Sequence, residues 1–172
     1  AERAPGPAQL GIDYPAISPD GRTIAIVTNE SGNADLWLLD VVRGTRSRLV
    51  AGSLVEFAPV WSSDGSRIVY QLAESPHAVL MDVSADGRGA PRRLGLGAWP
   101  TVARDGNAIL HEDSKGDQQK LYRLDLAEGT ASALVTPNPA TREIHPALSP
   151  DGRWLAYLSD EPGSFEVFLR GH

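Results

Sequence analysis

The chain consists of short apolar runs separated by polar, glycine-containing segments. Four of these runs each follow an Asp-Gly pair, and the first is Thr23–Thr28, with the sequence TIAIVT. Apolar side chains occur at both alternating sets of positions in these runs, for example at Ile24 and Ile26 on one face and at Ala25 and Val27 on the other. Such a run predicts a β-strand that is buried on both faces. The pattern therefore argues against an isolated sheet with one face in water.

The predicted strands belong to a sequence motif that recurs four times along the chain. A proline is followed five residues later by Asp-Gly in four places, starting from Pro15, Pro59, Pro100 and Pro146. The steps between Asp20, Asp64, Asp105 and Asp151 are 44, 41 and 46 residues. Repeats of about 40–45 residues made of short strands are typical of propellers, in which each repeat forms one four-stranded sheet. The sequence thus predicts an all-β fold, a β-propeller with four antiparallel four-stranded blades per chain.

The first repeat shows the expected layout of one blade. Its strands are predicted at 15–18, 23–28, 35–41 and 47–50, with turns at Pro19-Asp20-Gly21 and Arg43-Gly44, because proline and Asp-Gly suit tight reversals. The whole chain, 1–172, is expected to form a single propeller domain or half-propeller. Its blades are predicted at about 11–50, 54–95, 97–135 and 143–170.

The two chain ends suggest how the ring closes. The last repeat stops after its third strand, at 165–170, while residues 7–10 resemble an orphan fourth strand. We expect the N-terminal strand to complete the last blade, which would remove an exposed sheet edge. Two chains joined head to tail, each lending its first strand to the other, would form an eight-bladed homodimer. A closed four-bladed monomer and a piece excised from a longer propeller are the alternatives.

The repeat motif resembles a known family. Ser-Pro-Asp-Gly-Arg occurs at 18–22 and 149–153, and an acidic-apolar-aromatic strand follows at 35–37 and 166–168. These residues resemble the TolB-like, WD-type propeller repeats of bacterial proteins, and the stretch 149–170 is similar to propellers attached to bacterial Ser/Thr kinases. The third repeat departs from the motif, with Ala103-Arg104-Asp105-Gly106-Asn107. The resemblance implies binding of proteins or peptides on one face or in the central channel, and it favours a periplasmic or secreted location.

The composition of the chain argues against several classes of function. The formal net charge is −6 and 22% of the residues are charged, which does not favour nucleic acid or an anionic membrane. No apolar run has the length of a membrane-spanning helix, so we expect no membrane insertion. Cysteine is absent, which excludes disulfides and cysteine-based metal sites but identifies no compartment. Residues 1–7 lack the apolar core of a signal peptide, as a mature exported chain would after cleavage.

One set of residues is a candidate ligand site. Tyr14, Trp99 and His145 each precede the repeat proline, and Ala58 has the same place in the second repeat. An aromatic rim at the mouth of the channel would supply contact area and polar groups for a ligand. Asp13 and Glu56 are expected as polar neighbours of this rim. The alternative is that these residues only pack between adjacent inner strands.

Other candidate chemistry favours structural roles. His111 replaces an inward apolar residue of its strand, so we expect a packed, hydrogen-bonded histidine. His77 lies in a turn and His172 is terminal. The acidic segment 112–117 lacks the order of a calcium loop and predicts a solvated turn, and the basic stretch 88–93 predicts a solvated edge. No metal or other cofactor is expected.

No catalytic motif is present in the sequence. There is no Gly-x-Ser-x-Gly elbow, no Gly-x-Gly-x-x-Gly loop and no His-Arg-Asp triplet. We therefore expect a non-catalytic binding or scaffold module for a protein, a peptide or a small ligand, with a protein or peptide partner favoured. An accessory sensor or gating propeller of a larger kinase or hydrolase is the second possibility. The third is an engineered or excised propeller fragment that self-assembles.

Overall fold

A computed structural model describes residues 11–30, 32–113, 119–134, 138 and 140–172. Within these ranges the chain is built from β-strands and turns, and there is no helix with the length and apolar character needed to cross a membrane. The strands are β1 (Ile12–Ile17), β2 (Thr23–Thr28), β3 (Asp35–Asp40), β4 (Arg46–Arg48), β5 (Glu56–Trp61), β6 (Arg67–Ala73), β7 (Ala78–Ser84), β8 (Arg92–Leu96), β9 (Ala98–Val102), β10 (Ala108–Asp113), β11 (Lys120–Asp125), β12 (Ala131–Ala133), β13 (Glu143–Leu148), β14 (Trp154–Ser159) and β15 (Glu166–Gly171).

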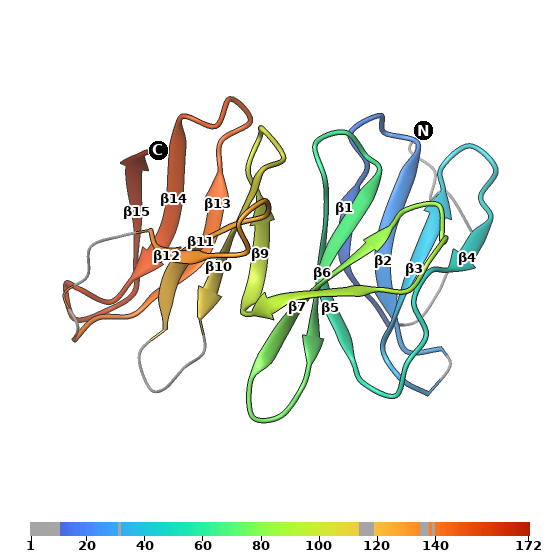
Figure 1. Ribbon diagram of the computed structural model, residues 1–172, viewed down its shortest axis with the longest axis horizontal. Coiled ribbons are helices and arrows are strands. Elements are labelled where there is room, and N and C mark those ends of the chain that lie inside the picture. Colours follow the sequence, from blue (N-terminus) through green and yellow to red (C-terminus); the bar gives the residue numbers. More distant parts are fainter. Residues whose placement is uncertain (1–10, 31, 114–118, 135–137, 139) are drawn as a thin grey trace.

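The strands form four separate antiparallel sheets, each from consecutive segments of the chain. We call them blade 1 (β1–β4), blade 2 (β5–β8), blade 3 (β9–β12) and blade 4 (β13–β15). They follow one another across the molecule in chain order (Figure 1). The first strands β1, β5, β9 and β13 contact one another in succession and so form the inner side of the row. The expected all-β fold with antiparallel propeller blades is confirmed.

Turn chemistry explains why each blade begins as it does. The Ser18 hydroxyl donates to Asp20 Oδ1 at 2.7 Å and accepts the Thr23 amide at 2.9 Å. The same pair of bonds recurs at Ser62 and Ser149. The third repeat has Ala103 here, yet its backbone turn persists, with the Gly106 amide 2.9 Å from the Ala103 carbonyl oxygen. The repeat turn is therefore set by Asp-Gly, and the serine adds to it.

The strand bounds agree with the sequence in the middle of a blade and differ at its inner edge. β2 covers the predicted 23–28, and β3 ends one residue before the predicted 41. The prediction that the first strand begins at Pro15 is wrong, because β1 begins at Ile12 and continues through an irregularity before that proline. The fourth strand of blade 1 is displaced to Arg46–Arg48.

Three apolar cores lie between neighbouring blades. Each joins a residue of one blade to residues of the next: Ala25 to Ile68, Val69 to Ile109, and Leu110 to Leu155. Each core also receives the last residues of the following inner strand, namely Trp61, Val102 and Leu148. The second strands are thus covered on both faces, as their continuous apolar character predicts.

Closure of the ring stays a prediction. Blade 4 contains three strands among the described residues, with β15 at its edge. The predicted closing strand, residues 7–10, lies outside those residues. No described strand joins the sheet of blade 4 to that of blade 1.

Candidate functional site

The residue before each repeat proline has an unusual backbone. Tyr14, Ala58, Trp99 and His145 have φ of 52°, 44°, 50° and 54°, and no other non-glycine residue in the described ranges has a positive φ. In each blade the pairing register between the first two strands shifts around this residue, as at a β-bulge. Left-handed conformation costs an L-residue about 1–2 kcal/mol. The blades therefore hold one strained residue each, at the same repeat position on the inner side.

The bulges bring aromatic side chains from all four blades together. The ring of Tyr14 lies 5.9 Å from that of Phe57 and 5.8 Å from that of Trp99, and Trp99 lies 5.1 Å from His145. All three contacts are edge-on, the geometry that aromatic pairs prefer. We call Tyr14, Phe57, Trp99 and His145 the aromatic row. Tyr14 is 37% exposed and the His145 side chain 48%, so the row reaches the surface.

In two of the bulges, a polar side chain of the preceding blade holds the backbone of the residue with positive φ. The Trp99 amide donates to Gln71 Oε1 at 3.2 Å, and the His145 amide donates to Glu112 Oε1 at 2.6 Å. Gln71 and Glu112 have equivalent places in β6 and β10, each opposite a buried leucine of the third strand. The bulges of blades 3 and 4 are thus each held by a side-chain acceptor from the preceding blade.

Of these two acceptors, Glu112 is the ionisable one. Its side chain is buried, and burial raises the pKa of its carboxyl group, while the His145 amide and then the His145 ring oppose the rise. The His145 Nδ1 atom lies 3.5 Å from Glu112 Oε1, and the Gln119 side-chain amide donates to Oε2 at 3.3 Å. Glu112 therefore constrains His145 through both its backbone and its ring.

The two expected polar neighbours lie in different environments. Asp13 is exposed, next to Tyr14 on β1. Glu56 is only 1% exposed and lies between blades 1 and 2, where its amide donates to the Ala34 carbonyl oxygen. Burial and then the Asp35 carboxylate raise the pKa of Glu56 to about 7, against the effects of the Leu36 amide and Arg48. Glu56 therefore belongs to the blade interface, and Asp13 is the carboxylate beside the row that a ligand can reach.

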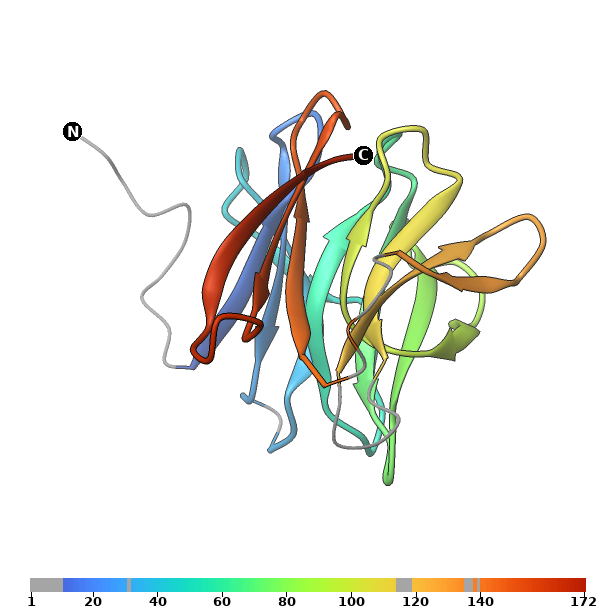
Figure 2. The ribbon, with the colours of Figure 1, turned by 90° about the vertical axis from the view of Figure 1, so that its left-hand side faces the viewer.

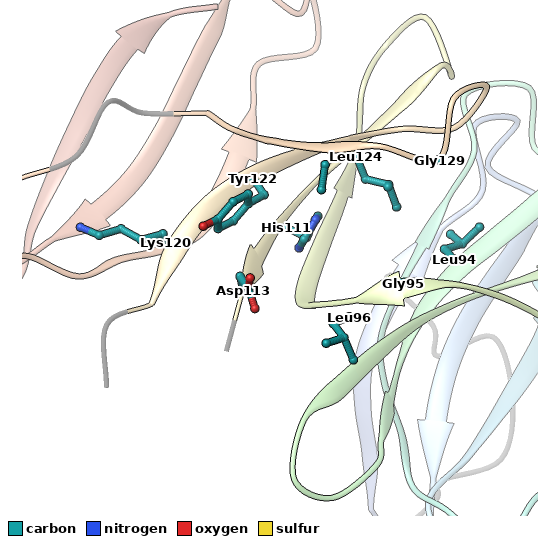
Figure 3. A pocket seen from close by; sticks show the side chains of 10 residues that line it. Leu94, Gly95, Leu96, His111, Asp113, Lys120, Tyr122, Leu124 and Gly129 are labelled. Carbon is teal, nitrogen blue, oxygen red and sulfur yellow. The ribbon is translucent and has the colours of Figure 1, made fainter. Parts of the chain in front are cut away.

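A separate cavity of about 380 Å³ lies between β8 of blade 2 and β10–β12 of blade 3. Figure 3 shows His111 and Tyr122 side by side on one side of it and Leu94 and Leu96 on the other. His111 is 2% exposed, its Nδ1 lies 3.0 Å from the Glu112 carbonyl oxygen, and its ring stacks on Tyr122. Burial lowers the pKa of His111, which favours the neutral ring. The histidine is thus packed and hydrogen-bonded.

The remaining candidate residues do not come together in one site. His77 lies in the bend before β7, and His172 follows β15. In the basic stretch, Arg92 pairs with Asp82 at 3.0 Å and Arg93 with Glu74 at 2.6 Å, so these charges are compensated within blade 2. Most of the acidic segment, residues 114–117, lies outside the described residues. Among the residues that the structure describes, no three histidine or carboxylate side chains lie together as a metal site requires.

Comparison with known protein families shows to which family this chain belongs. The TolB beta propeller domain matches residues 10–170. The chain belongs to the TolB beta propeller domain family. This agrees with the motif resemblance seen in the repeats.

Individual relatives of this TolB-like chain support the same affiliation. The Protein TolB homolog of Chlorobium luteolum is 33% identical over 151 residues, which cover 87% of this chain and 34% of the relative. An uncharacterized peptidase of Bacillus subtilis, YuxL, is 26% identical over 85% of this chain and 21% of its own length. The crystal structure of TolB from Acinetobacter baumannii superposes with a TM-score of 0.81 at 23% identity, over 93% of this chain and 41% of that one. This TolB-like chain thus spans less than half the length of each of these three proteins.

Sequence reasoning placed Tyr14, Trp99 and His145 together but missed three residues of the TolB-like site. Phe57 precedes the one repeat position that has alanine, and its ring contacts Tyr14. Gln71 and Glu112 are polar residues in otherwise apolar second strands, at the same repeat position. That shared position was the available signal, because a polar side chain in a buried strand needs a hydrogen-bond partner.

Proposed function

We propose that this chain is a non-catalytic binding module, and that a protein or peptide partner docks on the aromatic row. The observation that supports this most is the concentration of backbone strain at one repeat position. Strained residues persist where the surrounding structure holds them, and they cluster at ligand sites. Here the strain directs three partly exposed rings, those of Tyr14, Trp99 and His145, to one place.

The chemistry of the row suits a protein segment. Rings of tyrosine, tryptophan and histidine offer large apolar area together with polar atoms, as in the energetic centres of protein interfaces. Asp13 adds an exposed carboxylate at the edge. Because Gln71 and Glu112 already fix the backbone under Trp99 and His145, little ordering entropy is lost on binding.

Selection of peptides tests the proposal without knowledge of the natural partner. A displayed random-peptide library is selected on the wild-type protein, and the enriched peptides are then measured by calorimetry on Trp99→Ala and His145→Ala. We expect each substitution to weaken binding at least about tenfold, or 1.4 kcal/mol. Phe165→Ala is the matched control, because Phe165 is an aromatic residue 39% exposed outside the row. Peptides that bind Trp99→Ala and His145→Ala as tightly as wild type would show that the row is not the docking site.

The peptidase relative supports a second candidate function. YuxL is named a peptidase, and this chain matches only 21% of it. In the second candidate, the propeller is an accessory domain of a larger hydrolase or kinase and controls access or senses a signal. The full-length gene product decides between the two, since a catalytic domain on the same polypeptide would favour the accessory role.

A further inference from the structure

The cavity between blades 2 and 3 lies where one residue of the repeat has no side chain. The fourth-strand segment of blade 1 has Arg-Leu-Val at 48–50, and that of blade 2 has Arg-Leu-Gly at 93–95, in the same register on the third strand. Gly95 thus has the place of Val50, which is buried in the core between blades 1 and 2. Gly95 lines the cavity, and a Cβ added to it would meet no atom of the described residues within 4 Å.

His111 is a second, smaller residue at the same interface. It has the place in β10 that Tyr70 has in β6 and Tyr157 has in β14. Both tyrosines pack in interblade cores, and Tyr70 shares its core with Val50. The pair Gly95 and His111 therefore replaces the pair Val50 and Tyr70 one interface further along the chain. The two replacements explain why blades 2 and 3 enclose about 380 Å³ of space here.

The ring of His111 is held in one orientation. Its Nδ1 atom lies 3.0 Å from the Glu112 carbonyl oxygen, and a carbonyl oxygen only accepts, so Nδ1 carries the hydrogen. A Cβ at Gly97 would clash with the same nitrogen, so this glycine lets the ring approach the corner between β8 and β9. Because burial favours the neutral ring, Nε2 is left as a hydrogen-bond acceptor.

Nε2 of His111 has no hydrogen-bond partner within the part of the chain that the structure describes. The His111 side chain is 2% exposed and lines the cavity, and its ring projects from β10 into it (Figure 3). A buried acceptor without a partner costs about 1–3 kcal/mol. A ligand that donates a hydrogen bond to Nε2 would remove that cost.

The other walls of the cavity define the body of such a ligand. Leu94, Leu96 and Leu124 are apolar, and Tyr122 adds a flat ring that stacks on His111. A flat apolar molecule fits against these side chains, whereas a charged one would lose its hydration beside the leucines. A cavity of this volume is in the range of small-molecule sites.

The cavity lies at the outer edge of the blades, where a small molecule can enter. Figure 2 shows β8 and the β11–β12 hairpin at the same edge of the molecule, on the right in that view. Gly129 and Ala131, which belong to the hairpin, are exposed and line the cavity. The aromatic row lies instead on the inner strands, so the two sites are separate.

We propose that this cavity binds a small neutral ring compound that donates one N–H or O–H hydrogen bond to His111 Nε2. Indoles and phenols belong to this class. The site is additional to the docking of a protein or peptide on the aromatic row, and each can exist without the other.

The wild-type protein allows the first test, with indole and benzofuran as probes. The two molecules have the same shape, but benzofuran has an oxygen atom in place of the indole N–H group. In titrations followed by the backbone amide signals in NMR, indole should bind with a dissociation constant of about 1 mM or less. Benzofuran should bind at least about tenfold more weakly, because it leaves Nε2 without a donor. The amide signals of Gly95 and His111 should be among those that indole shifts most.

Two substitutions test the cavity and the acceptor separately. Gly95→Val restores the side chain of the equivalent Val50 and should weaken the binding of indole at least about tenfold, because it fills the space. His111→Phe keeps a ring but removes Nε2, and it should abolish the preference for indole over benzofuran. Gly171→Val is the matched control, since a Cβ there also meets no described atom within 4 Å and Gly171 lies outside the cavity. It should bind indole as wild type does.

Three outcomes would overturn the proposal. Indole that does not saturate the wild-type protein would show that the cavity takes no ligand of this class. Indole that binds Gly95→Val as tightly as wild type would bind elsewhere. Equal affinities of the wild-type protein for indole and benzofuran would exclude Nε2 as the atom that is recognised. If circular dichroism shows that one variant does not fold, the other variant and the wild-type comparison decide.

Discussion

Glu56 and Glu143 have the same repeat position but different neighbours. Each begins an inner strand and donates its amide to the chain segment before the third strand of the preceding blade. Glu143 lies 3.5 Å from the Lys120 ammonium group, whereas Glu56 is near Asp35, which pairs with Arg48 at 2.6 Å. The same residue is thus an ion-pair partner in one interface and a buried acid beside another acid in the other.

Glu56 should make the stability of blades 1 and 2 depend on pH. Its pKa is about 7 in the folded protein against 4.5 ordinarily, so the folded state binds the proton more tightly. The stability from this proton is fully present below about pH 4.5 and is lost as the pH rises through about 7. Glu56→Gln should therefore raise the free energy of unfolding at about pH 8, by at most about 3 kcal/mol, and change it little at about pH 4. Urea unfolding at the two pH values measures this.

Glu143→Gln is the control for that experiment and should act in the opposite direction. It removes the charge that faces Lys120, at a site where both side chains are largely buried, and should cost about 3 kcal/mol at neutral pH. Arg48 and Tyr70 also face Glu56, and both are kept in each variant. A Glu56→Gln protein that is equally destabilised at both pH values would contradict the argument.

These differences could not be foreseen from the sequence. The repeat aligned Glu56 with Glu143, but the deciding neighbours, Asp35 and Lys120, belong to the previous blade. Their effect depends on which side chains meet across an interface and on how far water is excluded. Periodicity supplies positions, whereas the sign of an electrostatic contact needs three-dimensional distances.

At the scale of one element, the residues of the repeat turn differ in what they contribute to its backbone conformation. Asp-Gly occurs in all four turns, while the serine is missing in the third, where Ala103 stands. In the other turns the hydroxyl bonds both the Asp carboxylate and an amide of the second strand, and it contributes most to lowering the pKa of Asp64 and Asp151 to about 2. The third turn keeps its backbone without these bonds.

Ala103→Ser should therefore stabilise the protein. The new hydroxyl would have the Asp105 carboxylate as acceptor and the Ala108 amide as donor, by equivalence with Ser18, Asp20 and Thr23. A gain of about 1 kcal/mol is expected in urea unfolding. Ser18→Ala should lose a similar amount, and Ala103→Ser combined with Asp105→Ala should show no gain. An unchanged or lower stability of Ala103→Ser would mean that the buried site, where Ala103 packs in an apolar core, rejects the hydroxyl.

The inner strands mark where sequence reading of elements failed. Strand β2 was predicted to the residue because its apolar run and flanking turns are local signals. The bulge before each proline was not predicted, since proline in a strand usually signals an end. The structure instead places Tyr14 and its equivalents inside the strand, with positive φ, where Gln71 and Glu112 hold two of the bulges from the neighbouring blade. That support is non-local and absent from any single repeat.

At the scale of the whole molecule, the place of a blade in the row decides what its residues contribute. Repeat proteins are stabilised by contacts between nearest neighbours, so a residue matters where a neighbour covers it. Leu80 packs in the core shared with blade 3, and Leu80 and Leu121 are both 0% exposed, while the equivalent Val167 is 73% exposed. The repeat pattern assigns all three to one class, and the structure divides them.

Truncating these three residues should reveal that division. Leu80→Ala and Leu121→Ala should each cost about 2–5 kcal/mol, because each removes buried methyl groups and leaves a cavity between blades. Val167→Ala should cost under about 0.5 kcal/mol, since most of its surface is exposed. Urea unfolding of the three variants measures these costs, and the two leucine variants provide the internal standard. A Val167→Ala protein that loses as much stability as Leu80→Ala would contradict the division of the three residues by burial.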